Sequence, residues 1–182
     1  MIDVRWYGRG GQGVFTAARL LGRIISVYQG GYALSYPSFG PERRGAPVWG
    51  FTRIDDEKII DRGQPESCDY LIIFDETLVD EGIFDVLKED GVAIMNTSGQ
   101  GEYGFVRQKL VCMDAGSMAM DILGRPITNV AMIGALSAVS GIFGPDVVDK
   151  AIKEQFPFEI YEKNKRLLDR SYECAKGGNH LG

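Results

Sequence analysis

The chain has 182 residues, which predicts a single domain large enough to bury a core without disulfide staples. Hydrophobic residues make up 45% and charged residues 25%, as in globular proteins, and no apolar run approaches the roughly 20 residues of a membrane span. The net charge of −5 disfavours general nucleic-acid binding. The cysteines at 68, 112 and 174 form no Cys-x-x-Cys motif, so we expect reduced thiols in a cytoplasmic protein and no iron–sulfur or zinc site.

The first segment of the chain predicts an anion-binding loop. Residues 2–7 have the pattern of a strand and residues 14–28 that of a helix. Between them, the segment YGRGGQGV places Gly8, Gly10 and Gly13 in the spacing G-x-G-x-x-G. A strand, a tight glycine loop and a helix N-terminus present backbone N–H groups and a partial positive charge to a ligand. The alternative is a glycine turn that serves only the close packing of strand and helix.

The sequence after this loop disfavours a nicotinamide dinucleotide as the ligand. That fold needs an Asp or Glu about 20 residues further on to hold the ribose hydroxyls. No acid occurs between Val4 and Pro41. Residues 1–53 instead hold seven arginines and no lysine against Asp3 and Glu42, a charge of +5, which leaves −10 for the remainder. We therefore expect a local site for another phosphorylated ligand.

The middle of the chain alternates between strand and helix patterns. Gly30-Gly31 ends the first helix, and a short strand follows to about Ser35. Residues 36–47 are rich in Pro, Gly and aromatics and predict an ordered functional loop. Further on, the patterns predict a strand at 48–54 with a hairpin continuing over 58–61, a strand at 70–74 buried on both faces, a helix at 77–89, and strands at 91–96 and 110–114.

Beyond residue 115 the pattern is helical. Small residues along 129–143 predict close helix packing, Gly144-Pro145-Asp146 predicts a helix start, and 159–175 carries an apolar stripe. The alternation predicts one three-layer α/β domain over residues 1–176, with a mainly parallel, mixed sheet and a helical C-terminal third. Residues 177–182 predict a flexible tail.

Catalytic side chains are scarce in this sequence. The single histidine, His180, lies in the predicted tail, and no cluster of metal-ligand types occurs, so we predict no catalytic and no metal-binding residue. Asp75-Glu76 follows an apolar strand, a position typical of ligand sites, although capping of the next helix explains the pair equally well. A binding loop without a general base suits a subunit that holds a ligand for a catalytic partner.

Several longer segments carry a resemblance to a known family. They are GRGGQGV at 8–14, FGPERRGAPV at 39–48, TRIDDEKI at 52–59, DYLIIFDE at 69–76, NT at 96–97, NVAMIGA at 129–135 and NKR at 164–166. Together they resemble the gamma subunit of 2-oxoacid:ferredoxin oxidoreductases, the pyruvate type in particular. Because the resemblance spans nearly the whole chain, it is far more specific than the glycine loop alone.

The resemblance implies an enzyme of several subunits. Its reaction is the oxidative decarboxylation of a 2-oxoacid, in which coenzyme A accepts the acyl group and ferredoxin takes the electrons. This chain would share the coenzyme A site, whereas thiamine diphosphate, Mg and 4Fe-4S clusters would lie in partner subunits of the alpha, beta and delta types. The chain would be inactive alone and would bind neither nucleic acid nor membrane; a homodimer of the isolated chain stays open.

The resemblance also implies cofactor-binding residues. Arg43 and Arg44 match cationic positions against the phosphates of coenzyme A, which suits the planar donor fork of arginine. Arg125 and Asn129 match a basic residue and an amide that face the nucleotide, with a loop cation and a helix N-cap as the alternative interpretation. The loop whose backbone meets the ligand corresponds to Gly10, Gly11, Gln12 and Gly13.

The choice of substrate stays open at this level. The segment ERRGAPV at 42–48 is closer to pyruvate and branched-chain types, because Gly45-Ala46 stands where 2-oxoglutarate types more often have a doubled glycine. Pyruvate is therefore expected, with 2-oxoisovalerate or 2-oxoglutarate as alternatives. A stand-alone nucleotide-binding module or an NAD-dependent oxidoreductase is the alternative of another class.

Overall fold

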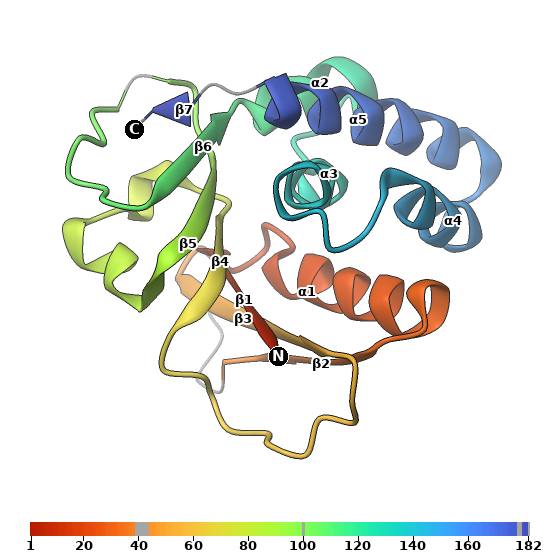
Figure 1. Ribbon diagram of the computed structural model, residues 1–182. Helices are drawn as coiled ribbons and strands as arrows, with labels where there is room; N and C mark the ends of the chain where they lie inside the picture. The colour runs from red at the N-terminus through yellow and green to blue at the C-terminus, as the bar shows by residue number, and fades with distance from the viewer. Residues whose placement is uncertain (39–43, 100, 178–179, 182) are drawn as a thin grey trace.

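The computed structural model describes residues 1–38, 44–99, 101–177 and 180–181 (Figure 1). Within these ranges, seven strands form one mixed sheet in the order β2-β3-β1-β4-β5-β6-β7. The strands β1, β4, β5 and β6 are parallel neighbours at its centre, and β3, β2 and β7 pair antiparallel to either side. The bounds are β1 (Ile2–Arg9), β2 (Tyr32–Pro37), β3 (Pro47–Asp55), β4 (Cys68–Ile73), β5 (Leu87–Asn96), β6 (Lys109–Met113) and β7 (His180–Leu181).

In the described part of the chain there are five α-helices, and they lie on one face of the sheet (Figure 1). The first helix ends in a π-helical turn, η1 (Ile24–Gln29), and then at Gly30 in the left-handed conformation. The other face is covered by two 3₁₀ segments, η2 (Glu76–Leu78) and η3 (Glu81–Val86), and by loops. The helical layer on one face of the sheet is therefore thicker than the layer of 3₁₀ segments and loops on the other face. The helices are α1 (Val14–Arg23), α2 (Ala115–Leu123), α3 (Asn129–Ser140), α4 (Pro145–Gln155) and α5 (Phe158–Gly177).

The α/β class, the mixed sheet and the helical C-terminal third are confirmed, as are the strands predicted from the buried apolar runs. The sheet is less parallel than expected, because three of its six pairings in the described part of the chain are antiparallel. Strands β4, β5 and β6 contribute side chains to both cores, which explains the apolar runs in their sequences.

Two predicted elements are wrong. The helix expected at 77–89 is two 3₁₀ segments, because Asp75 and Asp80 each cap a separate turn and β5 already begins at Leu87. The hairpin expected over 58–61 is absent from this described segment; β3 pairs with β2 instead, while the segment after it runs without regular structure. Within the predicted tail, His180–Leu181 forms β7, antiparallel to β6. The domain limit at residue 176 stays a prediction.

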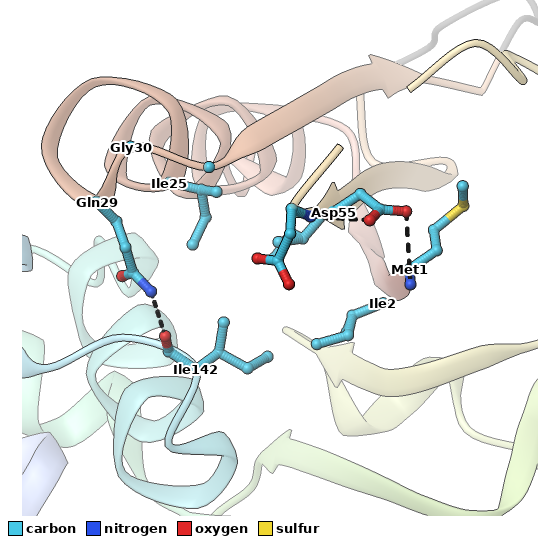
Figure 2. Close-up of a pocket in the computed structure, with 10 residues that line it drawn as sticks. Met1, Ile2, Ile25, Gln29, Gly30, Asp55 and Ile142 are labelled. Carbon is cyan, nitrogen blue, oxygen red and sulfur yellow. Dashed lines mark hydrogen bonds and ion pairs between the residues drawn. The ribbon is translucent and has the colours of Figure 1, made fainter. Parts of the chain in front are cut away.

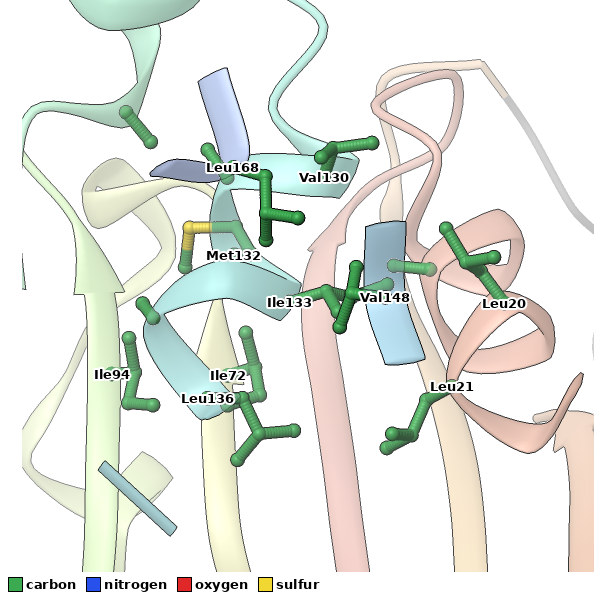
Figure 3. Close-up of a cluster of buried hydrophobic side chains, with 14 of the residues drawn as sticks. Leu20, Leu21, Ile72, Ile94, Val130, Met132, Ile133, Leu136, Val148 and Leu168 are labelled. Atoms are coloured by element: carbon green, nitrogen blue, oxygen red, sulfur yellow. The ribbon is translucent and has the colours of Figure 1, made fainter. Parts of the chain in front are cut away.

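The larger core lies between the sheet and the helices (Figure 3). Helix α3 occupies its centre and is buried along most of its length, so it packs on strands on one side and on α5 on the other. Ile72 and Ile94 face it from the sheet, and Leu21 and Val148 contact the same core from α1 and α4. In the described part of the chain, no helix is both long and apolar enough to cross a membrane.

Gly134 sets the spacing between α3 and α5. A Cβ atom at this position would lie 3.1 Å from the Leu168 carbonyl oxygen and would also meet Ser171 Oγ. We expect Gly134→Ala to lower the free energy of unfolding by about 1–3 kcal/mol, because overpacking forces the two helices apart. Urea denaturation measures this. Gly104→Ala is the matched control, since a Cβ there has nothing within 4 Å; equal stability of the two variants would contradict the close contact.

Candidate functional site

The glycine loop, residues 10–13, joins the end of β1 to the start of α1. Gly11 and Gly13 have φ values of 99° and 82°, a left-handed conformation that strongly favours glycine. A Cβ atom on Gly13 would lie 2.5 Å from Asn129 Oδ1. Glycine is therefore favoured here for two reasons, the backbone conformation and the close contact with the Asn129 side-chain amide.

A second turn, residues 44–46, is fastened to the glycine loop. Gly10 N donates to the Ala46 carbonyl at 2.8 Å, and Gly45 N donates to the Gly10 carbonyl at 3.0 Å. The Arg44 side chain is exposed, and its Cγ would lie 3.9 Å from a Cβ atom on Gly11. The structure thus brings Arg44 beside the glycine loop. Arg43 lies outside the described residues.

Asn129 is the first residue of α3, and Thr128 holds the N-cap position, so the interpretation of Asn129 as the cap is wrong. Asn129 Oδ1 is buried and has no hydrogen-bond partner among the described residues. Arg125 is exposed in the connection between α2 and α3. The site therefore combines the N-termini of α1 and α3, and each adds partial positive charge and free backbone N–H groups.

Asp75 binds the glycine loop from the end of the neighbouring strand. Because β1 and β4 pair in register up to Tyr7 and Ile73, the segments that follow them lie side by side. Asp75 Oδ2 accepts from Arg9 Nε and from Gln12 Nε2, both at 2.9 Å. Burial raises the pKa of the Asp75 carboxyl, but hydrogen bonds from Thr77, Gln12 and Arg9 outweigh it and hold the pKa below its usual range. The carboxylate is therefore ionised at neutral pH.

Glu76 makes a separate network further along the same edge. Its carboxylate accepts from Tyr103 Oη at 2.7 Å, from the Thr97 hydroxyl, and from Ser98 N at 3.2 Å. Burial raises the pKa of Glu76, whereas these hydrogen bonds lower it, and the net direction is down. Glu76 therefore ties the end of β4 to the loop that follows β5, with its acceptor oxygens already used.

Sequence reasoning noticed the Asp75-Glu76 pair but assigned it no partner, and it missed Arg9 as a structural link. Arg9 lies within the glycine motif, and from the sequence alone it is one of the seven arginines that make residues 1–53 basic. Its contacts with Asp75 and Thr77 span more than 60 residues. The signal available was the position of the two acids directly after a buried parallel strand next to β1.

A pocket of about 310 Å³ lies elsewhere, at the opposite end of β1 (Figure 2). Met1 and Ile2 line it, whereas the glycine loop follows Arg9 at the far end of the same strand. Several of its polar groups pair with one another: the N-terminal amine lies 3.5 Å from Asp55 Oδ2, and Gln29 donates to the Ile142 carbonyl. We therefore place the candidate site at the glycine loop rather than at this pocket.

The buried cysteines, Cys68 and Cys112, are poorly suited to thiolate chemistry. Burial raises the pKa of Cys68 to about 12 and that of Cys112 to about 11. No group of three or more His, Cys, Asp or Glu side chains that could hold a metal ion occurs among the described residues. What this arrangement offers chemically is a set of donors for an anionic ligand.

Comparison with known proteins identifies the family. The family model described as pyruvate ferredoxin/flavodoxin oxidoreductase matches residues 3–174. The pyruvate synthase subunit PorC of Methanothermobacter thermautotrophicus is 45% identical over 95% of each chain. The common gamma subunit of the pyruvate/ketoisovalerate oxidoreductases of Pyrococcus furiosus is 40% identical over 95% of this chain and 96% of its own.

A solved structure of a related subunit agrees with the family model and with these sequence relatives. The pyruvate oxidoreductase subunit PORC of Thermotoga maritima has a TM-score of 0.83 and 35% identity, covering 94% of this chain and 95% of its own. The resemblance inferred from the sequence motifs is therefore confirmed. The chain belongs to the pyruvate ferredoxin/flavodoxin oxidoreductase family.

Proposed function

We propose that this chain is the gamma subunit of a pyruvate:ferredoxin oxidoreductase and contributes part of its coenzyme A site. The reaction converts pyruvate, coenzyme A and two oxidised ferredoxins into acetyl-CoA, CO₂, a proton and two reduced ferredoxins. Thiamine diphosphate with Mg and the 4Fe-4S clusters supply decarboxylation and electron transfer, and in this proposal they lie in partner subunits of the alpha, beta and delta types.

One observation carries the assignment of the ligand. The glycine loop, Arg44 and Asn129 come from three distant parts of the chain and meet at two helix N-termini. Coenzyme A carries a pyrophosphate and a 3′-phosphate, and such groups bind at helix N-termini and to arginine. The buried Asn129 oxygen without a partner fits a ligand donor. In the proposal, Gly10, Gly11, Gln12 and Gly13 supply backbone contacts, and Arg43, Arg44 and Arg125 supply charge.

The relatives support a role in a step shared by several substrates. The P. furiosus relative is named as the common subunit of a pyruvate and a ketoisovalerate enzyme. A subunit common to two enzymes does not by itself decide which 2-oxoacid reacts. In the proposal, this chain therefore binds coenzyme A, which is a substrate of both enzymes, and the partner subunits contact the 2-oxoacid. Pyruvate is the proposed substrate, with 2-oxoisovalerate and 2-oxoglutarate as alternatives.

Replacing Arg43 and Arg44 with Ala should raise the KM for coenzyme A about tenfold or more in the assembled enzyme, because each charge-assisted hydrogen bond contributes roughly 1.5–3 kcal/mol. The KM for the 2-oxoacid should change much less. High salt should weaken coenzyme A binding more in the wild type than in the variant.

Arg62→Ala is the matched control for this charge removal. Arg62 is also an exposed arginine, but it precedes β4, at the end of the parallel strands opposite the glycine loop. The assembled enzyme with Arg62→Ala should have the same KM for coenzyme A as the wild type. An unchanged coenzyme A dependence in an assembled Arg43/Arg44 variant would show that these arginines are ordinary surface charges.

Purification of the tagged chain from its own cells should recover partner subunits that carry thiamine diphosphate and iron–sulfur clusters. The chain purified alone should not reduce ferredoxin with pyruvate, because the described residues gather no metal-ligand set. Oxidoreductase activity of the isolated chain, or tight NADH binding that Gly10→Val abolishes, would favour the alternative of a stand-alone enzyme.

A further inference from the structure

The carboxylate of Asp75 lies where three segments meet. Its side chain is 15% exposed, directly after β4. Oxygen Oδ2 accepts from Arg9 at the end of β1 and from Gln12 in the glycine loop. Oxygen Oδ1 accepts from Thr77 N at 3.0 Å and from Thr77 Oγ1 at 2.5 Å. The two oxygens thus do different work: Oδ1 caps η2, and Oδ2 holds the loop.

Arg9 extends this contact to the second turn of the site. While its Nε binds Asp75, Nη1 donates to the Gly45 carbonyl at 3.1 Å and Nη2 donates to Thr77 Oγ1 at 2.9 Å. A guanidinium is planar, so fixing one edge orients the donors on the other. Gly45 directly follows Arg44. The orientation of Arg9 therefore affects the position of the backbone from which the Arg44 side chain extends.

Gln12 couples the same carboxylate to the glycine loop itself. Its Nε2 donates to Asp75 while its Oε1 accepts from Arg9 N at 2.7 Å. The Gln12 side-chain amide therefore links the glycine loop to the end of β1, and its hydrogen bond to Asp75 fixes its orientation. The Gln12 side chain is engaged on both sides, which leaves its backbone, rather than its amide, to face a ligand.

We propose that Asp75 is a positioning residue for the coenzyme A site: it holds Arg9 and Gln12 so that the glycine loop and Arg44 keep their relative placement. The inference rests on the proposed function above and goes beyond it, because Asp75 itself carries the same sign of charge as the ligand. Backbone hydrogen bonds between Gly10 and Gly45–Ala46 remain without Asp75, so the loops stay attached but lose their fixed orientation.

Charge alone predicts the opposite outcome from positioning. Removing a carboxylate beside a phosphate ligand should strengthen binding, because the repulsion between like charges disappears. Loss of orientation should weaken binding, because ordering the loops then costs free energy at each binding event. The direction of the change in KM for coenzyme A therefore discriminates between an ordinary neighbouring charge and a positioning residue.

The test uses three variants in the assembled enzyme. Asp75→Ala removes both functions, Asp75→Asn keeps an oxygen to cap Thr77 but loses the charged partner of Arg9, and Asp80→Ala removes the acidic cap of η3, whose carboxylate accepts from Ile83 N. We expect both Asp75 variants to raise the KM for coenzyme A about fivefold, with kcat and the KM for the 2-oxoacid within about twofold. Asp80→Ala should match the wild type in all three.

A double-mutant cycle with Arg44→Ala completes the test. If Asp75 acts by placing Arg44, the combined variant should show less than the product of the two single effects. A KM for coenzyme A that falls or stays unchanged in both Asp75 variants, while Arg44→Ala raises it, would overturn the positioning role and leave the proposed function intact. If neither position affects coenzyme A, the proposed function fails, and the inference fails with it.

Discussion

The close approach of α1 and α3 at Gly13 is the constraint on which the site depends. With 2.5 Å between a would-be Cβ atom and Asn129 Oδ1, a side chain larger than hydrogen at residue 13 would displace the Asn129 amide from its place beside the glycine loop. Asn129 begins α3, which lies at the centre of the larger core and packs on α5. The glycine loop is therefore a packing element, and this role is compatible with the proposed role in ligand binding.

The order of the strands gives a second reason to disfavour a dinucleotide at the glycine loop. In a dinucleotide-binding fold the strand beside the first runs parallel to it and carries the acid for the ribose at its carboxyl end. Here that place is taken by β3, which runs antiparallel to β1. Its carboxyl end, at Asp55, lies at the opposite edge of the sheet from the glycine loop. The motif is thus shared with nicotinamide enzymes, while the surrounding topology differs.

The sequence predicted what local patterns determine. Strand–loop–helix order around Gly10–Gly13 and the buried strands followed from periodicity, and the family followed from motifs spread along the chain. The prediction of one helix at 77–89 was wrong because the spacing of Leu78, Ile83 and Leu87 is compatible both with a helix and with two short turns followed by a strand. The links of Arg9 to Asp75, and of Asn129 to Gly13, join residues more than 60 positions apart. Only the paired register of β1 with β4 and the placement of α3 bring them together.

The unequal layers of the sheet imply unequal local stability. On the helical face, opening any part of α3 would expose core from several helices, so we expect its amides to exchange with solvent only through large-scale unfolding. On the other face, η2 and η3 are short 3₁₀ turns with few backbone bonds of their own, and local opening there costs less. The contact between Gly13 and Asn129 lies on the helical face, where we expect slow exchange. Asp75 lies at the start of η2, on the face where we expect faster exchange. The loops of the candidate site thus lie at the boundary between a face that we expect to be rigid and one that we expect to open more readily.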